Sequence, residues 1–511
     1  MIEKNYSWLD NAVFYEIYPQ SFRDTNADGI GDFNGIIEKL DYIKELGCNA
    51  IWINPCFLSP FGDAGYDVQD YCTVAPRYGT NEDLIRLFNE AHKRDMHVIL
   101  DLVPGHTSVE HKWFKESIKP ERNEYSDRYI WTNSIWESVD CLPCLRGISQ
   151  RDGSVALNFF STQPALNYGY YKPTLSWHQG MNDEGPLATR EAMKDVMRFW
   201  LNAGCDGFRV DMAGSLVKND PDGEGTIELW QDFRRFLDEE FPHAAMVSEW
   251  GEPDKSLKGG FHMDFLLHFG PSHYNDLFRC DEPYFSKRGK GTAEEFIKKY
   301  TENYEKTDGK GLICIPSGNH DMDRLARRLD SDEIKVAFAF LLTMPGAPFI
   351  YYGDEIGMNY VENITSVEGG YGRTGSRSPM QWSKGLNAGF SSATADKLYI
   401  GLDPSADRPD AESQMADENS IYSEVKRLIA LRMANPALQS NAKIQWVRFD
   451  YPTIYLRECA EQKIEIVINP SSQPCEVNHP EGRLLYSVGD VEMTQNTAKL
   501  GSCSAAIIEY K

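Results

Sequence analysis

Short apolar runs alternate with amphipathic segments along most of the chain. The amphipathic segments, such as 81–94 and 189–203, have the three-to-four-residue spacing of helices, and we expect the second helix to begin at Thr189. The apolar runs have the length of strands and occupy residues 13–18, 50–54, 97–103, 206–211, 245–249, 263–267, 312–316 and 348–352. Alternating strands and helices indicate a parallel sheet, and eight such strands predict an α/β protein with a closed (β/α)8 TIM barrel.

Two stretches depart from this alternation. Residues 107–172, rich in Trp, Tyr, Asn and Pro, separate the third strand from the next helix and predict an inserted small domain. After about residue 435 short alternating segments such as 464–468 and 505–509 predict a C-terminal antiparallel β domain. The predicted organisation is a barrel over 1–106 and 173–434, an inserted domain B over 107–172, and the β domain over 435–511.

The longest apolar stretch does not have the pattern of a membrane span. Residues 336–352 are interrupted by Pro345 and Pro348, so we interpret them as a buried helix followed by a buried strand. The first six residues lack the basic start and apolar run of a signal peptide. Neither feature places the protein in or across a membrane.

The composition limits the kinds of molecule that the protein can bind. The chain has 511 residues, with 52 basic and 77 acidic side chains and a net charge of −25, which would repel nucleic acid and anionic membranes. A hydrophobic share of 41% excludes large-scale disorder. The 11 cysteines are an odd number and include a single Cys-x-x-Cys, Cys141 and Cys144, without a second pair to complete a zinc site. They predict reduced thiols in a cytoplasmic protein.

Several predicted barrel strands end in titratable side chains. Each such residue taken alone has a structural explanation as a helix cap or a solvated loop residue. In a TIM barrel, however, the carboxyl ends of the strands meet on one face, where their charges would repel one another unless a ligand used them. The residues are His106, Arg209, Asp211, Glu249, His320 and Asp321.

Three carboxylates on one face fit retaining cleavage of a glycosidic bond. One ionised carboxylate attacks the sugar carbon, and a second, kept protonated, donates to the leaving oxygen about 5 Å away. The third holds sugar hydroxyls and raises the pKa of the acid by like-charge repulsion. Arg209, two residues before Asp211 and on the same face of its strand, would keep that carboxylate ionised.

These stretches resemble the signatures of the α-amylase superfamily, glycoside hydrolase family 13. The matching segments are 101–106 (DLVPGH), 207–211 (GFRVD), 248–250 (SEW) and 318–321 (GNHD), in the family's order and at comparable spacing. The resemblance implies that Asp211 is the nucleophile, Glu249 the general acid/base and Asp321 the transition-state stabiliser. It also implies that Arg209, His106 and His320 surround the sugar before the scissile bond and that Tyr66 stacks on it.

A narrower resemblance is to the oligo-1,6-glucosidase and trehalose synthase branch. It rests on segments 65–71 (GYDVQDY), 163–168 (QPALNY) and 377–382 (RSPMQW). It implies that Asp67 and Arg377 clamp the non-reducing-end glucose and close the groove into a pocket, which means exo action. A loop arginine paired with any carboxylate is the alternative for Arg377.

Three positions depart from the family pattern. Gly105 stands where the family usually has Asn, and Ala165 stands where the branch has Asp. Met212, the residue after the nucleophile, is neither the Val that resembles 1,6-specific enzymes nor the Ala or Thr that resembles 1,4-specific ones. The linkage cleaved is therefore left open.

A loop near the N-terminus has the oxygen ligands of a metal site. Residues 24–32 (DTNADGIGD) place oxygen-bearing side chains at alternate positions with a glycine at the turn, as a hard cation requires. An EF-hand is excluded because its twelfth position is Gly35 and not Glu. The branch resemblance implies one structural calcium, with magnesium and a metal-free Asx turn as alternatives. The implied ligands are Asp24, Asn26, Asp28, Asp32 and the carbonyl of Ile30.

The resulting functional hypothesis is a cytoplasmic, retaining, exo-acting α-glucosidase of short α-glucosides: isomalto- or malto-oligosaccharides, or sucrose. Its partner is expected to be a small oligosaccharide, and its assembly a monomer or weak homo-oligomer. A glucosyl transferase or isomerase of the trehalose synthase or sucrose isomerase kind and an endo-acting amylase are alternatives. A non-catalytic binding protein is disfavoured because Asp211, Glu249 and Asp321 are all present.

Overall fold

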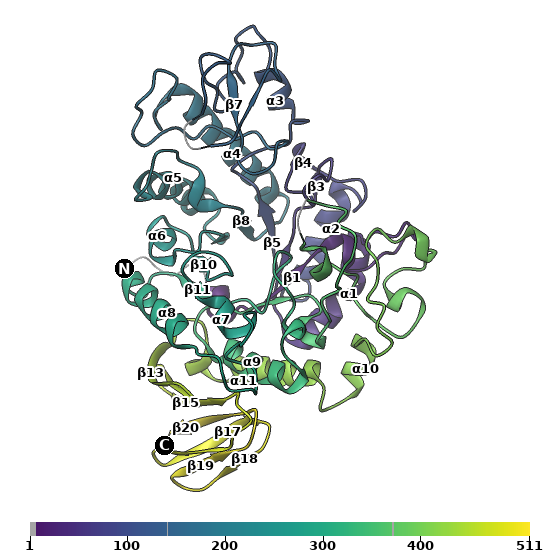
Figure 1. Cartoon of the computed structure of the whole chain (residues 1–511), viewed down its shortest axis with the longest axis vertical. Helices are drawn as coiled ribbons and strands as arrows, with labels where there is room; N and C mark the ends of the chain where they lie inside the picture. The colour runs from purple at the N-terminus through teal and green to yellow at the C-terminus, as the bar shows by residue number, and fades with distance from the viewer. Residues whose placement is uncertain (1–6, 140–141, 370–371, 511) are drawn as a thin grey trace.

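The computed structural model of the chain describes residues 7–139, 142–369 and 372–510. The molecule is elongated (Figure 1): a central barrel carries the segment with α3 and β7 at one end and the C-terminal strands at the other. Cys141, one half of the Cys-x-x-Cys pair, and the first six residues lie outside the described part of the chain.

Eight parallel strands form the barrel, and each lies within one of the eight predicted runs. They are β1 (Phe14–Ile17), β2 (Ala50–Ile53), β5 (His97–Leu102), β8 (Gly207–Val210), β9 (Ala245–Ser248), β10 (Met263–Phe265), β11 (Leu312–Cys314) and β12 (Phe349–Tyr351). The sheet order is β11-β10-β9-β8-β5-β2-β1-β12, and a parallel bridge between Pro316 and Phe349 joins its two edges. The predicted barrel is confirmed.

The helices follow from local sequence signals. A capping box between Thr80 and Asp83 starts α2 (Asn81–His92). The helix expected to begin at Thr189 instead begins at Glu184, as α4 (Glu184–Asn202). The early start is allowed because Pro186 falls in the first turn, where a backbone N–H has no partner within the helix. The other helices are α1 (Phe33–Leu46), α3 (Lys112–Ser117), α5 (Glu224–Glu240), α6 (Pro253–Lys258), α7 (Tyr274–Phe278), α8 (Glu294–Thr307), α9 (Ser331–Thr343), α10 (Ala411–Ala416) and α11 (Ile421–Ala434).

Two small hairpins rise above the barrel. One, β3 (Phe57–Leu58) and β4 (Asp70–Val74), follows the second barrel strand. The other, β6 (Cys144–Arg146) and β7 (Ser154–Ala156), lies in the long segment between β5 and α4 that was predicted as an insertion. The exact limits of that domain stay a prediction.

The C-terminal strands form two antiparallel sheets, as predicted. The larger has the order β13-β14-β15-β20-β17 and the smaller β16-β19-β18. Their bounds are β13 (Lys443–Phe449), β14 (Thr453–Glu458), β15 (Lys463–Asn469), β16 (Cys475–Asn478), β17 (Gly482–Val488), β18 (Val491–Met493), β19 (Thr497–Leu500) and β20 (Ser504–Tyr510). Figure 1 shows them together in yellow below α9 and α11.

Two buried arginines bond the C-terminal end of α9, and one of them, Arg457, joins the C-terminal β strands to the barrel. Arg432 of α11 donates to the carbonyls of Leu342, Met344 and Gly346, and Arg457 of β14 donates to that of Thr343. These carbonyls lie at and just beyond the C-terminal end of α9, where cations are favourable. Burial lowers the pKa of Arg432 to about 9 and that of Arg457 to about 10.

The interpretation of residues 336–352 as a buried helix and strand is confirmed by α9 and β12. Among the described residues, none of the helices combines the length and the apolarity that crossing a bilayer requires. The ten cysteines in the described part of the chain are free thiols.

Candidate active site

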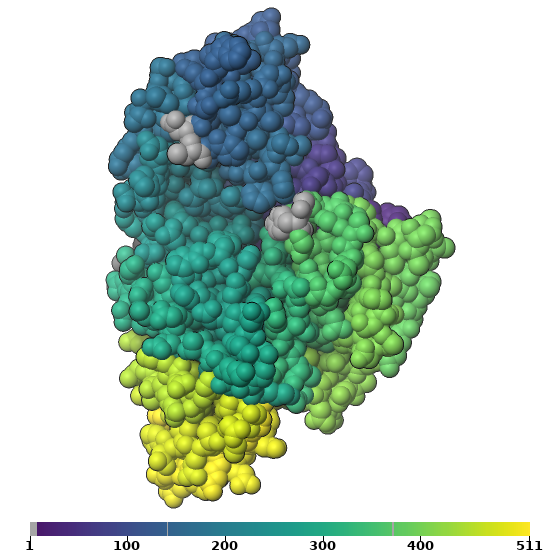
Figure 2. Space-filling view, in the orientation of Figure 1, coloured from purple at the N-terminus to yellow at the C-terminus, as the bar shows by residue number. Residues whose placement is uncertain are grey.

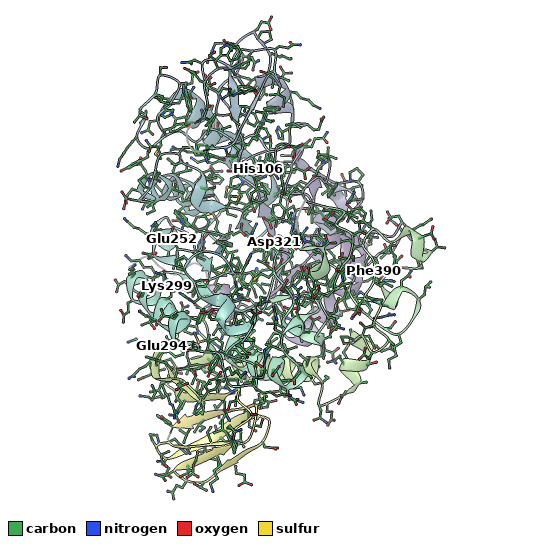
Figure 3. The ribbon with its side chains drawn as sticks, viewed as in Figure 1. His106, Glu252, Glu294, Lys299, Asp321 and Phe390 are labelled. Atoms are coloured by element: carbon green, nitrogen blue, oxygen red, sulfur yellow. The ribbon has the colours of Figure 1, made fainter. Side chains whose placement is uncertain are left out.

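A cavity of about 440 Å³ lies over the carboxyl ends of the barrel strands. Figure 2 shows this side of the molecule, with the inserted segment in blue above the teal and green barrel. In Figure 3, His106 lies toward the inserted segment and Asp321 near the centre of the barrel. The predicted site residues that line the cavity are Tyr66, His106, Asp211, Glu249 and Asp321.

Arg209 holds the two carboxyl groups that the chemistry requires. Its Nη1 contacts Asp211 at 3.0 Å, and its Nη2 contacts Glu249 at 2.8 Å. Asp211 and Glu249 each follow a barrel strand by one residue, and their amides still bond to Leu102 and Val210 of the neighbouring strands. The same guanidinium contacts Asp101 of β5 at 2.9 Å. The sheet therefore fixes both carboxyl groups around one cation.

The two carboxyl groups differ in proton affinity. Burial raises the pKa of Asp211 to about 7, against the opposing effect of Arg209. Burial raises the pKa of Glu249 to about 8; Arg209 opposes this shift, and the charges of Asp211 and Asp321 add to it. Both shifts are upward, so near neutral pH the pair holds one shared proton, as one acid and one nucleophile require.

Asp321 is held ionised by three neighbours. Burial alone would raise its pKa, but His320, Arg377 and Arg373 hold the pKa of Asp321 well below its usual range. Both arginines contact Oδ1 of Asp321 at 2.7 Å. A permanently charged carboxylate at this position stabilises positive charge that develops on a sugar ring.

His320 lies beneath the cavity floor. Its Nδ1 lies 2.8 Å from Glu16 of β1, and its Nε2 lies 2.6 Å from the hydroxyl of Tyr66. The ring is fully buried and stacks on that of Tyr66, with 5.4 Å between ring centroids. Burial lowers the pKa of His320 well below its ordinary value. His320 therefore positions Tyr66, whose ring faces the cavity.

The structure does not bring Asp67 and Arg377 together as the expected clamp. Asp67 is buried, and its carboxylate accepts hydrogen bonds from the Ser59 hydroxyl and the amides of Gly62 and Asp63. Neither Asp67 nor Arg377 is one of the described residues that line the cavity. Asp67 shapes its own loop, and Arg377 reaches the site only through Asp321 and the carbonyl of His320.

A different pair, Asp63 and Arg373, each four residues earlier along the chain, lines the cavity. Arg373 forms ion pairs with Asp63 and Asp321, and the other oxygen of Asp63 accepts from Gln163 at 2.8 Å. Gln163 opens the segment 163–168 that carried the branch resemblance, but Asp63 and Arg373 were not predicted. Asp63 lies two residues before the segment 65–71 and Arg373 four residues before 377–382, and only the loop conformation distinguishes them from Asp67 and Arg377.

Aromatic and polar side chains also line the cavity. Phe159 and Phe269 are 49% and 38% exposed, and Trp250 is buried. A Cβ on Gly214 would lie 2.6 Å from the indole of Trp250, so glycine is required for this packing. Glu252 and His268 are the polar members of this group.

The predicted metal loop is built from side chains that bond to its own backbone. Asp24 accepts from the amides of Asn26, Ala27 and Gly29, and Asp32 accepts from the Gly35 amide at the start of α1. In the described part of the chain, no group of three or more His, Cys, Asp and Glu is placed to hold a metal ion. The loop offers oxygen donors alone, the chemistry that calcium prefers, and metal binding there stays a prediction.

Comparison with known proteins agrees with this geometry. Residues 16–441 match the family described as alpha amylase, catalytic domain. The trehalose synthase/amylase TreS of Mycolicibacterium smegmatis is 32% identical over 484 residues, which cover 84% of this chain and 77% of that protein. The oligo-1,6-glucosidase of Parageobacillus thermoglucosidasius is 30% identical over 568 residues, covering 96% and 97%. The crystal structure of Bacillus licheniformis trehalose-6-phosphate hydrolase superposes with a TM-score of 0.82 at 26% identity, covering 98% and 99%.

Proposed function

Because this chain belongs to the alpha-amylase family of glycoside hydrolases, we propose that it is a retaining, exo-acting α-glucosidase of short α-glucosides. One observation carries the proposal: Arg373 forms ion pairs with Asp63 and Asp321, and all three line the cavity together with the carboxyl pair. We infer that these ion pairs close one end of the cavity. A closed end accepts a terminal sugar and not the middle of a glucan. Substrates would be isomalto- or malto-oligosaccharides, or sucrose, cleaved from the non-reducing end.

In the first step, the terminal glucose occupies the closed end with its anomeric carbon between Asp211 and Glu249. The proton of Glu249 moves to the glycosidic oxygen as the bond from that oxygen to C1 breaks, and an ionised oxygen of Asp211 forms a new bond to C1. The aglycone leaves with the proton. Arg209, which contacts both groups, keeps them at the short separation that a retaining mechanism needs.

In the second step, Glu249 is a carboxylate and takes a proton from an incoming hydroxyl. The oxygen of that hydroxyl bonds to C1 while the bond to Asp211 breaks, which restores both groups. Asp321 stays ionised throughout and stabilises the positive charge on the ring in both transition states. The Tyr66 ring, held by His320, supplies a flat face for the sugar.

The incoming hydroxyl decides between hydrolysis and transfer. Water gives an α-glucosidase, whereas a sugar hydroxyl gives a transferase or isomerase of the kind that the name of the TreS relative describes. The aromatic side chains Phe159, Trp250 and Phe269 at the open end support an acceptor sugar as well as a leaving one. Transfer is therefore the second candidate function. Endo action is disfavoured by the closed end.

The open end favours a neutral aglycone. The trehalose-6-phosphate hydrolase that this chain resembles acts, by its name, on a phosphorylated sugar. Among the described residues that line the cavity, Arg373 is the one Lys or Arg side chain, and it pairs with Asp63 and Asp321. Glu252 also lines the cavity and pairs with Lys255 at 2.9 Å, so the nearby lysine is already engaged by a carboxylate. A phosphorylated substrate is therefore disfavoured.

We also propose one calcium ion, or magnesium, at the loop formed by Asp24, Asn26, Asp28, Ile30 and Asp32, supported by its oxygen-only donor set. The free thiols of the described cysteines support a reducing, cytoplasmic location. The net charge of −25 supports a monomer or weak homo-oligomer.

The test is a proton NMR time course with isomaltose, maltotriose, sucrose, trehalose and trehalose 6-phosphate in parallel. Release of α-glucose first, with later mutarotation, supports the retaining exo reaction, and the preferred substrate identifies the linkage. If new anomeric linkages appear without free glucose, the reaction is transfer and not hydrolysis. Initial release of β-glucose, or a mixture of internal fragments from longer glucans, would contradict the proposal.

A further inference from the structure

Gly105 and Asn158 compete for one small space beside the cavity. A Cβ built on Gly105 would lie 2.8 Å from Nδ2 of Asn158, closer than real Cβ atoms approach another heavy atom. Gly105 lies in the loop after β5, whereas Asn158 lies in the inserted segment after β7. The amide of Asn158 thus fills the position that a side chain at residue 105 would occupy.

The same amide contacts the imidazole that lines the cavity. Nδ2 of Asn158 lies 3.0 Å from Nδ1 of His106, and Nε2 of His106 lies 3.0 Å from the carbonyl oxygen of Tyr66. A carbonyl only accepts, so Nε2 carries a proton. Nδ1 is then free to accept the N–H of Asn158, which places the neutral ring in a single tautomer and orientation.

Asn158 also connects this ring to the reacting groups. Its Nδ2 lies 3.7 Å from the sulfur of Met212, the residue after Asp211. Its backbone amide donates to the carbonyl of Gln163, whose side chain donates to Asp63. One residue of the inserted segment therefore contacts His106 and Met212 directly and is linked to Asp63 through Gln163.

We propose that Asn158 is a positioning residue, which replaces the missing side chain at position 105 and holds His106 neutral, with its proton on Nε2, facing the sugar. This inference rests on the proposed function insofar as His106 faces a sugar; the tautomer itself does not depend on the substrate. An Asp at position 158 would accept from Nδ1–H and favour the doubly protonated ring. The charged groups that also act on this ring are Asp63 and Lys218.

A spectroscopic experiment tests the tautomer directly. Protein labelled with ¹⁵N in its histidine rings is measured at pH 7, and the His106 signals are assigned by their loss in His106→Gln. We expect the Nε2–H tautomer in the natural chain and signals of a doubly protonated ring in Asn158→Asp. An Nδ1–H tautomer in the natural chain, or an unchanged ring in Asn158→Asp, would overturn the proposal.

A double-mutant cycle tests whether Gly105 and Asn158 share one space. We expect kcat/KM to fall about tenfold in Asn158→Ala and at least as far in Gly105→Ala, which forces a Cβ against the amide. In the double variant the Cβ has room, so the loss should stay close to that of Asn158→Ala alone. Additive losses would contradict the shared space. Asn133→Ala, an exposed Asn of the same segment that bonds Ser176, is the matched control and should keep full activity.

The two experiments separate this inference from the proposed function. If the protein turned over none of the glucosides, the proposed function would fail, while the ring signals would still report on Asn158. Melting temperatures of every variant, measured by circular dichroism, identify any loss that comes from unfolding. A kcat/KM of Asn158→Ala equal to that of the natural chain, in a folded protein, would overturn the positioning role.

Discussion

The guanidinium of Arg373 contacts the carboxylate of Asp321 at 2.7 Å, joining the loop after β12 to the loop after β11. The same guanidinium pairs with Asp63 from the loop between β3 and β4, so a single side chain ties three loops together in the lining of the cavity.

Replacement of Arg373 by alanine should open the closed end. Two buried carboxylates, Asp63 and Asp321, would lose a cation, and the pKa of Asp321 would rise. We expect kcat/KM for a disaccharide to fall roughly 100-fold, in line with the cost of breaking a buried charge pair. Arg327→Ala, which removes a partly exposed arginine paired with Asp323 and Glu362, is the control and should keep its activity. Equal activity of both variants would show that Arg373 does not shape the site.

Asp211→Asn should abolish turnover while leaving the fold intact. The amide keeps the size of the carboxyl group and its contact with Arg209 but cannot attack C1. We expect kcat to fall by about 10³-fold or more, with a melting temperature close to that of the natural chain. Steady-state kinetics and a thermal melt on the same preparation provide the measurement. Preserved turnover in a folded variant would remove Asp211 from its assigned role.

The pH dependence of kcat/KM should be bell-shaped. The reaction requires Asp211 ionised, with a pKa of about 7, and Glu249 protonated, with a pKa of about 8, and the two carboxyl groups titrate as a coupled pair. Activity should therefore rise as pH increases through the lower value and fall through the higher one. In Glu249→Gln, assayed with an aryl glucoside whose leaving group needs no acid, the alkaline limb should disappear. Retention of that limb would assign it to another group.

A pair at the opposite end of the barrel strands should make stability depend on pH. His92 at the end of α2 contacts Asp206 at 2.8 Å; this hydrogen bond raises the pKa of His92, and the pKa of Asp206 is lowered although burial raises it. A histidine whose pKa is raised in the folded state stabilises the fold at pH values below its unfolded pKa of about 6.5. This stabilisation is lost as the pH rises through its folded pKa. An aspartate whose pKa is lowered in the folded state stabilises the fold at pH values above its unfolded pKa of about 3.8. This stabilisation is lost as the pH falls through its folded pKa.

The stability difference between the natural chain and His92→Gln should therefore be largest between about pH 4 and pH 6.5 and shrink at higher pH. Urea unfolding at a series of pH values measures it. His92 is 39% exposed at its side chain, so the difference should also decrease with added salt. His97, which contacts Asp206 from β5 at 3.2 Å, is left unchanged in both proteins. A difference that grows above pH 7 would contradict this assignment.

Removal of divalent cations tests the loop that begins at Asp24. If calcium binds there, a chelator should lower the melting temperature by about 3 °C or more, and added calcium should restore it, because a ligand that binds only the folded state stabilises it. Asp28→Ala, whose carboxylate bonds within the loop to the Ile30 amide, should be insensitive to both. A natural chain equally insensitive to the chelator would favour the metal-free turn.

The barrel and the reacting residues were predictable because their signals are local. A run such as 207–210 is buried wherever it lies in the barrel, so its apolar pattern marks a strand regardless of its neighbours. Asp211 and Glu249 follow such strands directly, and the topology of a barrel brings the ends of its strands to one face. The early start of α4 was missed because Pro186 was interpreted as lying before the helix.

The pairing of Arg373 with Asp63 and Asp321 was not predicted because loops are determined by distant contacts. Asp63 and Asp67 lie four residues apart, as do Arg373 and Arg377, and nothing in the residue types separates the members of each pair. A hydrogen bond from the Gly369 amide to the Gly62 carbonyl, together with the contact of Gln163 with Asp63, aligns loops that are distant in sequence. Asn158 was missed for the same reason, since its role depends on space left beside Gly105.

The sequence by itself therefore determined the eight-stranded barrel, the antiparallel C-terminal strands, the chemical class of the site and the positions of Asp211, Glu249 and Asp321. Only the tertiary structure decided which charged side chains close the cavity and which amide supports His106. The physical reason is that burial periodicity is a property of neighbouring residues, whereas the direction of a loop side chain depends on packing against segments far along the chain.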